Sequence, residues 1–237
     1  SKKLLKPLNI VKPIRAFHEH NEREKPKAII GELNSGRSIA LISDAGTPLI
    51  SDPGYQLVSE AKKTGINVVP IPGPNAAIAA LSSSGITSSS FSFFGFLPSK
   101  QNSRLKILKT KRSLDETIIF YESPKRILAT IKDMMAVFGE TRRVCLAKEL
   151  TKSFETILND NLIALTDYLE SDPSHQKGEF VLIVSPDDKI DFDEAKSELE
   201  KILPILCDEM GASKASKLAS KITGLDKKYC YKKAINL

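Results

Sequence analysis

The stretch SIALISDAGTP, residues 38–48, joins a short apolar run to a tight turn. The run at 38–42 has the length and composition of a buried strand, and the turn after it contains Asp44, Gly46 and Pro48. The same arrangement recurs where the run NVVPI, residues 67–71, leads into PGPNAA, residues 72–77. Ligands of open α/β sheets bind at the carboxyl ends of strands, so both turns are predicted to face one crevice.

Further strands and helices are predicted on both sides of this stretch. Apolar runs at 117–121, 144–147 and 180–184 have strand length. One helix is expected between Asp52 as its N-cap, with Pro53 at its first position, and Gly65 just past its end. A second is bracketed in the same way by Ser123, Pro124 and Gly139. Alternating strands and helices predict an α/β architecture.

Two polar segments divide the chain. The serine-rich tract at 82–90 is the predicted hinge between two α/β halves, and the segment 185–189 precedes a purely helical pattern. Helices are expected at 192–203 and 213–222, followed by Gly224 and a short segment from Asp226. The predicted domains are an N-terminal α/β domain at 1–84, a second α/β domain at 85–186 and a C-terminal helical domain at 190–237.

The composition is that of a folded protein without a membrane anchor. Hydrophobic residues make up 41% of the 237 residues and charged residues 27%, and no apolar run reaches the length of a membrane span. The three cysteines are far apart and lack a nearby histidine, so they are read as reduced thiols in a cytoplasmic protein. His18 and His20 are two positions apart with no third ligand, so no metal site is expected.

The positive charge is concentrated in two runs. Residues 100–112 hold six basic residues and no acidic one, and residues 212–237 hold seven lysines and Asp226 alone. Such clusters suit a polyanion such as RNA, whereas the simpler alternative is a solvated helix surface. The candidate RNA-binding residues are Lys100, Arg104, Lys106, Lys109, Lys214, Lys217 and Lys221.

The turns favour a small ligand that is not held by the familiar phosphate motifs. Neither G-x-x-x-x-G-K-[ST] nor G-x-G-x-x-G follows any predicted strand. Gly46 and Gly73 let the backbone approach a ligand, the neighbouring prolines stiffen the loops, and Asp44 adds a fixed charge suited to an ammonium, a sulfonium or a ribose hydroxyl. Each loop alone is also explained as an ordinary turn without a ligand.

Several motifs together resemble a known family. The first two turns are followed by FFGFLP from Phe93, FYESP from Phe120, KELTK from Lys148 and KGE from Lys177. Their order and spacing are similar to those of the bacterial 16S ribosomal RNA (cytidine) 2′-O-ribose methyltransferases of the tetrapyrrole methylase superfamily. The tail from Ser213 resembles the small helix-turn-helix domain that closes this family.

The resemblance implies a two-domain tetrapyrrole-methylase-like fold, a homodimer, and S-adenosyl-L-methionine in the cleft between the domains. It also implies methylation of a cytidine ribose in the small ribosomal subunit, and hence roles in rRNA processing and RNA methylation. The expected cofactor contacts are Ser43, Asp44, Thr47, Asn75, Ala76, Glu122 and Leu150, with Ala45 and Gly46 completing the first loop. Family members begin with a strand-helix-strand unit that is missing here, so the 237-residue chain is expected to lack one wall of the cofactor pocket, which puts the activity of this chain by itself in question.

Methyl transfer to a ribose hydroxyl needs positioning and benefits from a nearby base. Glu149 and Lys152 are the candidate catalytic residues, with Glu122 and Asp44 as further possible bases. Lys152 or Lys148 is alternatively placed to stabilise the developing alkoxide. Two other functions stay open: a methylase acting on a small molecule such as a corrin or porphyrin precursor, and a non-enzymatic RNA-binding protein.

Overall fold

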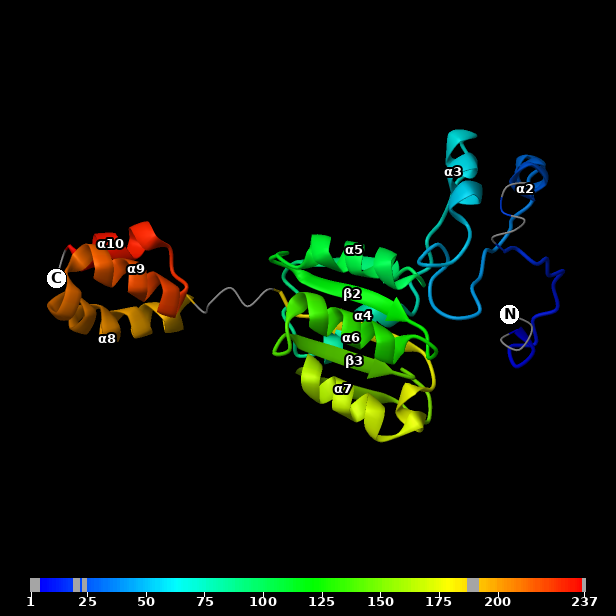
Figure 1. Ribbon diagram of the computed structural model, residues 1–237. Helices are drawn as coiled ribbons and strands as arrows, with labels where there is room; N and C mark the ends of the chain where they lie inside the picture. Colours follow the sequence, from blue (N-terminus) through cyan, green and yellow to red (C-terminus); the bar gives the residue numbers. More distant parts are fainter. Residues whose placement is uncertain (1–4, 19–21, 23–24, 187–191, 236–237) are drawn as a thin grey trace.

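A five-stranded mixed sheet forms the centre of the protein (Figure 1). The computed structural model describes residues 5–18, 22, 25–186 and 192–235. The strand order is β1-β2-β5-β3-β4, with β1 parallel to β2, and β5 antiparallel to both β2 and β3. The strands are β1 (Phe91–Phe96), β2 (Thr117–Glu122), β3 (Arg143–Lys148), β4 (Thr156–Asn161) and β5 (Phe180–Val184).

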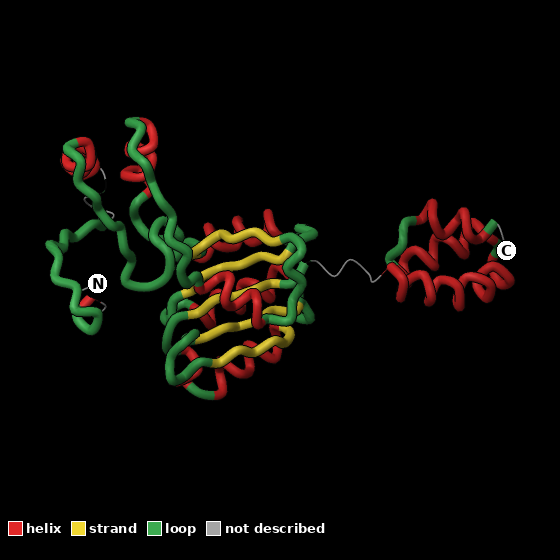
Figure 2. Tube along the Cα trace, turned by 180° about the vertical axis from the view of Figure 1, so that it is seen from behind, coloured by secondary structure: helices red, strands yellow, loops and turns green. Residues whose placement is uncertain are grey.

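Helices cover both faces of this sheet (Figures 1 and 2). Alternate strand residues point to opposite faces, so Ile118 and Phe120 pack on one side and Ile119 on the other. The first face is covered by α5 (Gln101–Lys111), α6 (Ile127–Phe138) and α7 (Leu162–Ser171), and the second by α4 (Ala76–Ser83). A strand that is covered on both faces has a continuous run of apolar residues, so β2, β3 and β5 can be predicted from the sequence.

The predicted strands at 117–121, 144–147 and 180–184 are confirmed. Strands β1 and β4, which lie at the two edges of the sheet, are not predicted by the sequence. Both carry exposed residues, and β4 contains Asn159, Asp160 and Asn161. Edge strands need fewer apolar residues than central ones, so neither forms a buried run.

The predicted strands at 38–42 and 67–71 are wrong for this chain: both segments lie outside any strand. Both segments have exposed apolar side chains, namely Ile39 and Ile42 in the first and Val69 and Ile71 in the second. A strand exists only where its backbone groups pair with a neighbouring strand. Within the described ranges no such neighbour lies beside either segment.

The helices before the sheet form a small cluster of their own. Helix α2 (Lys25–Asn34) packs against α3 (Tyr55–Lys63) through Ile30, Leu57 and Ala61. The predicted N-cap Asp52 is wrong, because Gly54 holds that position. The carboxylate of Glu22 instead accepts hydrogen bonds from the backbone N–H groups of Gly54 (2.9 Å) and Gln56 (3.2 Å).

The second predicted helix begins one turn later than expected. Arg126 is the N-cap of α6, so Ser123 and Pro124 form the turn before it, and Gly139 ends the helix as predicted. Helix α4, which precedes the predicted domain boundary at 84, packs against the sheet of the second half. The division of residues 1–186 into two domains therefore stays a prediction.

The C-terminal segment forms the predicted helical unit. It contains α8 (Phe192–Met210), α9 (Ala212–Thr223) and α10 (Lys227–Ala234) around a core that includes Leu199 and Ala219. Gly224 follows α9 in the left-handed conformation, as the sequence predicts. Asp226, where the sequence predicts only the start of a short segment, caps α10 by accepting from two backbone N–H groups. Among the described helices, none combines the length and apolar character of a membrane span.

Candidate functional site

The sequence motifs meet at one edge of the sheet. Glu122 at the end of β2 and Lys148 at the end of β3 both pair with Phe180 at the start of β5. The end of β1 lies in register there too, because Phe96 pairs with Tyr121. The loops after β1, β2 and β3 and the Lys-Gly-Glu segment before β5 therefore gather at the carboxyl ends of three strands, where α/β sheets bind ligands.

The second turn of the sequence is anchored at this edge. Asn75 caps α4 by accepting from the N–H groups of Ala77 (3.0 Å) and Ile78 (3.2 Å). The Tyr121 hydroxyl accepts from the same Ala77 N–H (3.2 Å), which ties α4 to β2. Burial raises the pKa of Tyr121, so this hydroxyl stays protonated. The sequence motif around Tyr121 does not predict this contact with α4.

The two turns lie side by side. The Thr47 hydroxyl donates to the Pro74 carbonyl oxygen at 2.8 Å, which joins the first turn to the second as the sequence predicts. Ser43 hydrogen-bonds the Asp52 carboxylate across the first loop and thereby fixes its shape. Because its carboxylate is bound to Ser43 within the loop, Asp52 does not act as the N-cap of α3.

The paired turns fit the cofactor that the sequence suggests. A side chain added at Gly46 would meet open space, and at Gly73 it would approach only one backbone oxygen, at 3.9 Å. A ligand can therefore reach the backbone at both glycines. Asp44 and Ala45 are exposed beside Gly46, so the loop offers a carboxylate next to small residues, suited to an ammonium, a sulfonium or a ribose hydroxyl.

The two expected cofactor contacts from the second half, Leu150 and Glu122, have different surroundings. Leu150 packs against the same apolar cluster as Ala76, so the structure brings these two predicted residues together. The Glu122 carboxylate is buried and turned toward α6, where it accepts from Ser123 N–H (2.7 Å) and Thr130 Oγ1 (2.6 Å) and pairs with Arg126 (2.7 Å). Three donors occupy its oxygens, so Glu122 holds the start of α6 and is poorly placed to act as a base.

The candidate catalytic residues form a charged cluster. Lys152 Nζ lies 2.8 Å from Glu149 Oε1 and 3.0 Å from Glu179 Oε2. Hydrogen bonding to Lys152 lowers the pKa of Glu149, and hydrogen bonding to Glu149 raises the pKa of Lys152. Glu149 is thus a weakened base and Lys152 a stable cation at neutral pH. This favours the alternative in which Lys152 stabilises a developing alkoxide.

The backbone around this cluster is strained. Glu149 and Thr151 have φ angles of 51° and 66°, in the left-handed region that side chains rarely adopt. The loop is held by bonds from Glu149 N–H to the Glu179 carbonyl oxygen (2.9 Å) and from Thr151 N–H to the Glu155 carboxylate (2.6 Å). Non-glycine residues in this conformation cluster at functional sites, which supports the assignment of this loop.

Gly178 keeps the cluster in place, and replacing it with alanine is expected to lower methyl transfer by about 10- to 100-fold. A Cβ at this position would lie 2.5 Å from Glu149 Cγ, so Glu149 would have to move away from Lys152. Gly139→Ala is the matched control, because Gly139 also has a positive φ but has nothing within 4 Å of its Cβ position. Rates and denaturant unfolding of both variants are the measurement, and equal rates would show that the position of Glu149 is unimportant.

The first basic run divides into surface and interior residues. Lys100, Lys106 and Lys109 are exposed. Arg104 is only 3% exposed and pairs with Asp133, at 2.6 Å from Nη2 to Oδ2. The structure corrects the expectation for Arg104, whose guanidinium binds within the protein and is not presented to RNA. Lys214, Lys217 and Lys221 are exposed on α9.

The structure describes only part of the histidine segment. His20 lies outside the described residues. Throughout the part of the chain that the structure describes, no group of three or more His, Cys, Asp or Glu side chains is arranged to hold a metal ion.

Comparison with known proteins identifies two matching families. Residues 2–166 match the family described as Tetrapyrrole (Corrin/Porphyrin) Methylases, and residues 193–237 match the RsmI C-terminal HTH domain. The protein named Ribosomal RNA small subunit methyltransferase I from Haemophilus influenzae is 46% identical over 229 residues, which are 96% of this chain and 81% of that protein. The protein of the same name from Pseudomonas aeruginosa is 45% identical over 234 residues, or 98% of this chain and 83% of that protein.

Solved structures agree on the fold. Diphthine synthase superimposes with a TM-score of 0.55 at 16% identity, covering 72% of this chain and 68% of that one. The methyltransferase CobJ gives a TM-score of 0.54 at 16% identity, covering 76% and 79%. The predicted α/β methylase fold with a C-terminal helical domain is confirmed.

Proposed function

Because the chain belongs to the tetrapyrrole methylase family, we propose that it transfers a methyl group from S-adenosylmethionine to the 2′-hydroxyl of a cytidine ribose in small-subunit ribosomal RNA. The chain is an S-adenosylmethionine-dependent ribosomal RNA methyltransferase by its likeness to relatives along nearly its whole length. One observation carries the substrate class: a methylase region is followed by the helix-turn-helix domain of the ribosomal RNA enzymes.

The site supports this chemistry in three ways. The paired turns around Thr47 and Asn75 present small residues and the Asp44 carboxylate at the carboxyl ends of the strands. Bound there, S-adenosylmethionine would supply a methyl group on a sulfonium, which is already an activated leaving group. Lys152, held by Glu149 and Glu179, is a fixed cation that stabilises the ribose oxygen as its proton leaves to solvent.

Partners and location follow from the proposed substrate. The exposed lysines of α5 and α9 suit ribosomal RNA or the small subunit as partner, and a ribosomal substrate places the protein in the cytoplasm. A homodimer is part of the proposal because the resemblance implies one. No residue is assigned to its interface.

The direct test is a methylation assay with the whole protein. Small ribosomal subunits from cells that lack this activity are incubated with methyl-labelled S-adenosylmethionine, and the RNA is digested to nucleosides. We expect the label in 2′-O-methylcytidine. Label on a base would refute the proposal, and transfer only to a corrin or porphyrin precursor would refute it in favour of the small-molecule methylase.

The first basic run yields a salt-dependence prediction. Changing Lys100, Lys106 and Lys109 to glutamine should weaken binding to small subunits at all RNA sequences and flatten the slope of log affinity against log salt by about 2 units. Cofactor affinity should not change, because none of the three lysines is among the expected cofactor contacts. Binding over a salt series is the measurement, with Lys132→Gln on α6 as a surface control. An unaltered slope would assign these lysines to the solvated surface.

A further inference from the structure

The unit formed by α8, α9 and α10 has two electrically different sides. The described side chains of α8 expose Glu198, Glu200, Asp208 and Glu209 against Lys201. The charged residues within α9 and α10 are all lysines, and Asp226, the exposed N-cap of α10, is the one acid beside them. The exposed lysines are Lys214, Lys217, Lys221, Lys227, Lys228, Lys232 and Lys233. A polyanion therefore meets this unit on the side of α9 and α10.

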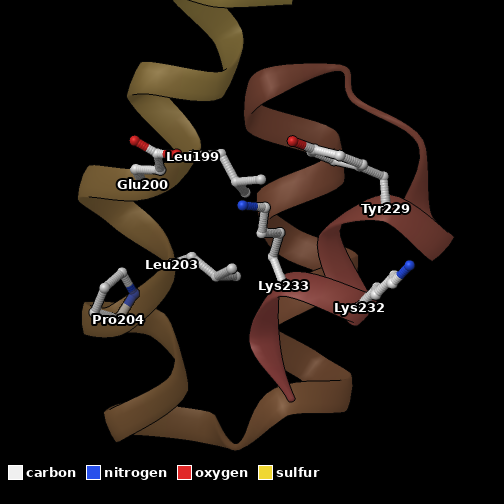
Figure 3. Close-up of a pocket in the computed structure, with 7 residues that line it drawn as sticks. All are labelled: Leu199, Glu200, Leu203, Pro204, Tyr229, Lys232 and Lys233. Carbon is white, nitrogen blue, oxygen red and sulfur yellow. The ribbon is translucent and has the colours of Figure 1, made fainter. Parts of the chain in front are cut away.

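A groove of about 510 Å³ opens between α8 and α10 (Figure 3). Its floor is apolar and consists of Leu199, Leu203 and Pro204 from α8. Pro204 has no backbone N–H and cannot donate the usual helical hydrogen bond to the carbonyl oxygen of Glu200, one turn earlier. The groove thus combines apolar side chains with a backbone acceptor that the helix leaves without its normal donor.

The wall of the groove that α10 supplies is aromatic and positively charged. Figure 3 shows Lys233 reaching from α10 into the space between the helices, with Tyr229 above it and Glu200 across from it, while Lys232 points outward at the rim. Tyr229 is partly buried against the core of the unit, so its ring is held in place, and both lysines are exposed.

We propose that this groove binds an unpaired nucleotide of the ribosomal RNA, an inference that rests on the proposed function. Unpaired bases are recognised by stacking on aromatic side chains and by hydrogen bonds to their edges. Tyr229 and the apolar floor provide the surface for the base, and Glu200 provides acceptors for N–H groups on the edge of the base, such as N3–H of uracil. Lys232 and Lys233 meet the flanking phosphates.

The charges around the groove favour an unpaired nucleotide over other binding partners. The groove opens on α10, which carries four exposed lysines in eight residues. A neutral apolar partner would gain nothing from these ammonium groups, and a paired RNA helix would keep its bases out of a groove of this kind. An acidic peptide would satisfy the lysines but would leave the ring and the floor without a flat partner.

The test uses the whole protein and a single-stranded RNA hexamer of uridines that contains one 4-thiouridine. Tyr229→Ala should weaken hexamer binding by roughly 5- to 150-fold, whereas Tyr229→Phe should bind nearly as the wild type does, because stacking needs only the ring. Lys233→Gln should flatten the salt slope by about 0.7. Lys201→Gln, an exposed lysine of α8 that does not line the groove, is the matched control.

Crosslinking decides where the base lies, independently of affinity and folding. The 4-thiouridine should crosslink to α10 or α8 at the groove, and a hexamer of glutamates should not compete. Wild-type affinity in Tyr229→Ala and Lys233→Gln, crosslinks confined to α9, or displacement by the acidic peptide would each overturn the inference. The methylation assay on small subunits is separate: retained methylation with an unused groove defeats only this inference, and hexamer binding in the groove without any methylation defeats only the proposed function.

Discussion

Replacing Asp133 with alanine is expected to lower the free energy of unfolding by about 3–5 kcal/mol, because it leaves a buried guanidinium without its anion. Asp133 accepts from Arg104 Nε at 2.7 Å and from Gln101 Nε2 at 2.8 Å, and the two charged side chains are only 4% and 6% exposed. This pair joins α5 to α6 over the sheet. Denaturant unfolding is the measurement.

A neighbouring ion pair provides the control for Asp133→Ala. Lys132 and Glu170 lie 2.6 Å apart with side chains that are 49% and 47% exposed. Water screens such a pair, so Glu170→Ala should cost less than about 1 kcal/mol. The double variant Arg104→Met, Asp133→Leu should recover much of the lost stability, because it removes both charges together. Equal effects of Asp133→Ala and Glu170→Ala would contradict the structural role given to Arg104.

The second large effect concerns the cofactor. Asp44→Ala is expected to weaken S-adenosylmethionine binding by roughly 10- to 150-fold, which corresponds to losing a hydrogen bond from a charged group of about 1.5–3 kcal/mol. Asp44 supplies the fixed negative charge within the first turn, beside Gly46 and the Thr47 contact to Pro74. Calorimetry on the whole protein measures the affinity.

Two variants show whether the charge of Asp44 matters. Asp44→Asn keeps the size and an acceptor but loses the charge, so it should lie between wild type and alanine. Glu140→Ala removes an exposed carboxylate that precedes β3, at the opposite edge of the sheet, and should leave binding unchanged. Unchanged affinity in Asp44→Ala with retained folding would make Asp44 an ordinary turn residue and move the cofactor elsewhere.

The strands that are buried on both faces of the sheet are the ones that the sequence predicts best. Strands β2, β3 and β5 are continuous apolar runs, and their positions could be predicted closely. The segments 38–42 and 67–71 have a similar composition, yet they form no strand. Strand formation requires a partner backbone, and composition alone carries no information about where that partner lies.

For the site, the sequence predicts which loops gather but not how their side chains are used. The motifs after β2 and β3 meet at Phe180 as the strand-end rule requires. The orientation of Glu122 toward α6 and the burial of Arg104 depend on contacts with Thr130 and Asp133, which are distant or unremarkable in the sequence. A charged residue in a basic run therefore cannot be assigned to the surface from the run alone.

The order of the strands also constrains how the protein folds during synthesis. Strand β5 lies at the centre of the sheet but is the last strand to leave the ribosome. Until it arrives, the pair β1–β2 and the hairpin β3–β4 each present an unpaired apolar edge, and such edges invite association with other chains. Closing the sheet then needs contacts between β2 and β5, more than 50 residues apart, and long-range contacts of this kind slow folding. Substitutions that weaken β5 should therefore lower the yield of folded protein in cells. This loss should be larger than the change in the free energy of unfolding of the purified protein alone would explain.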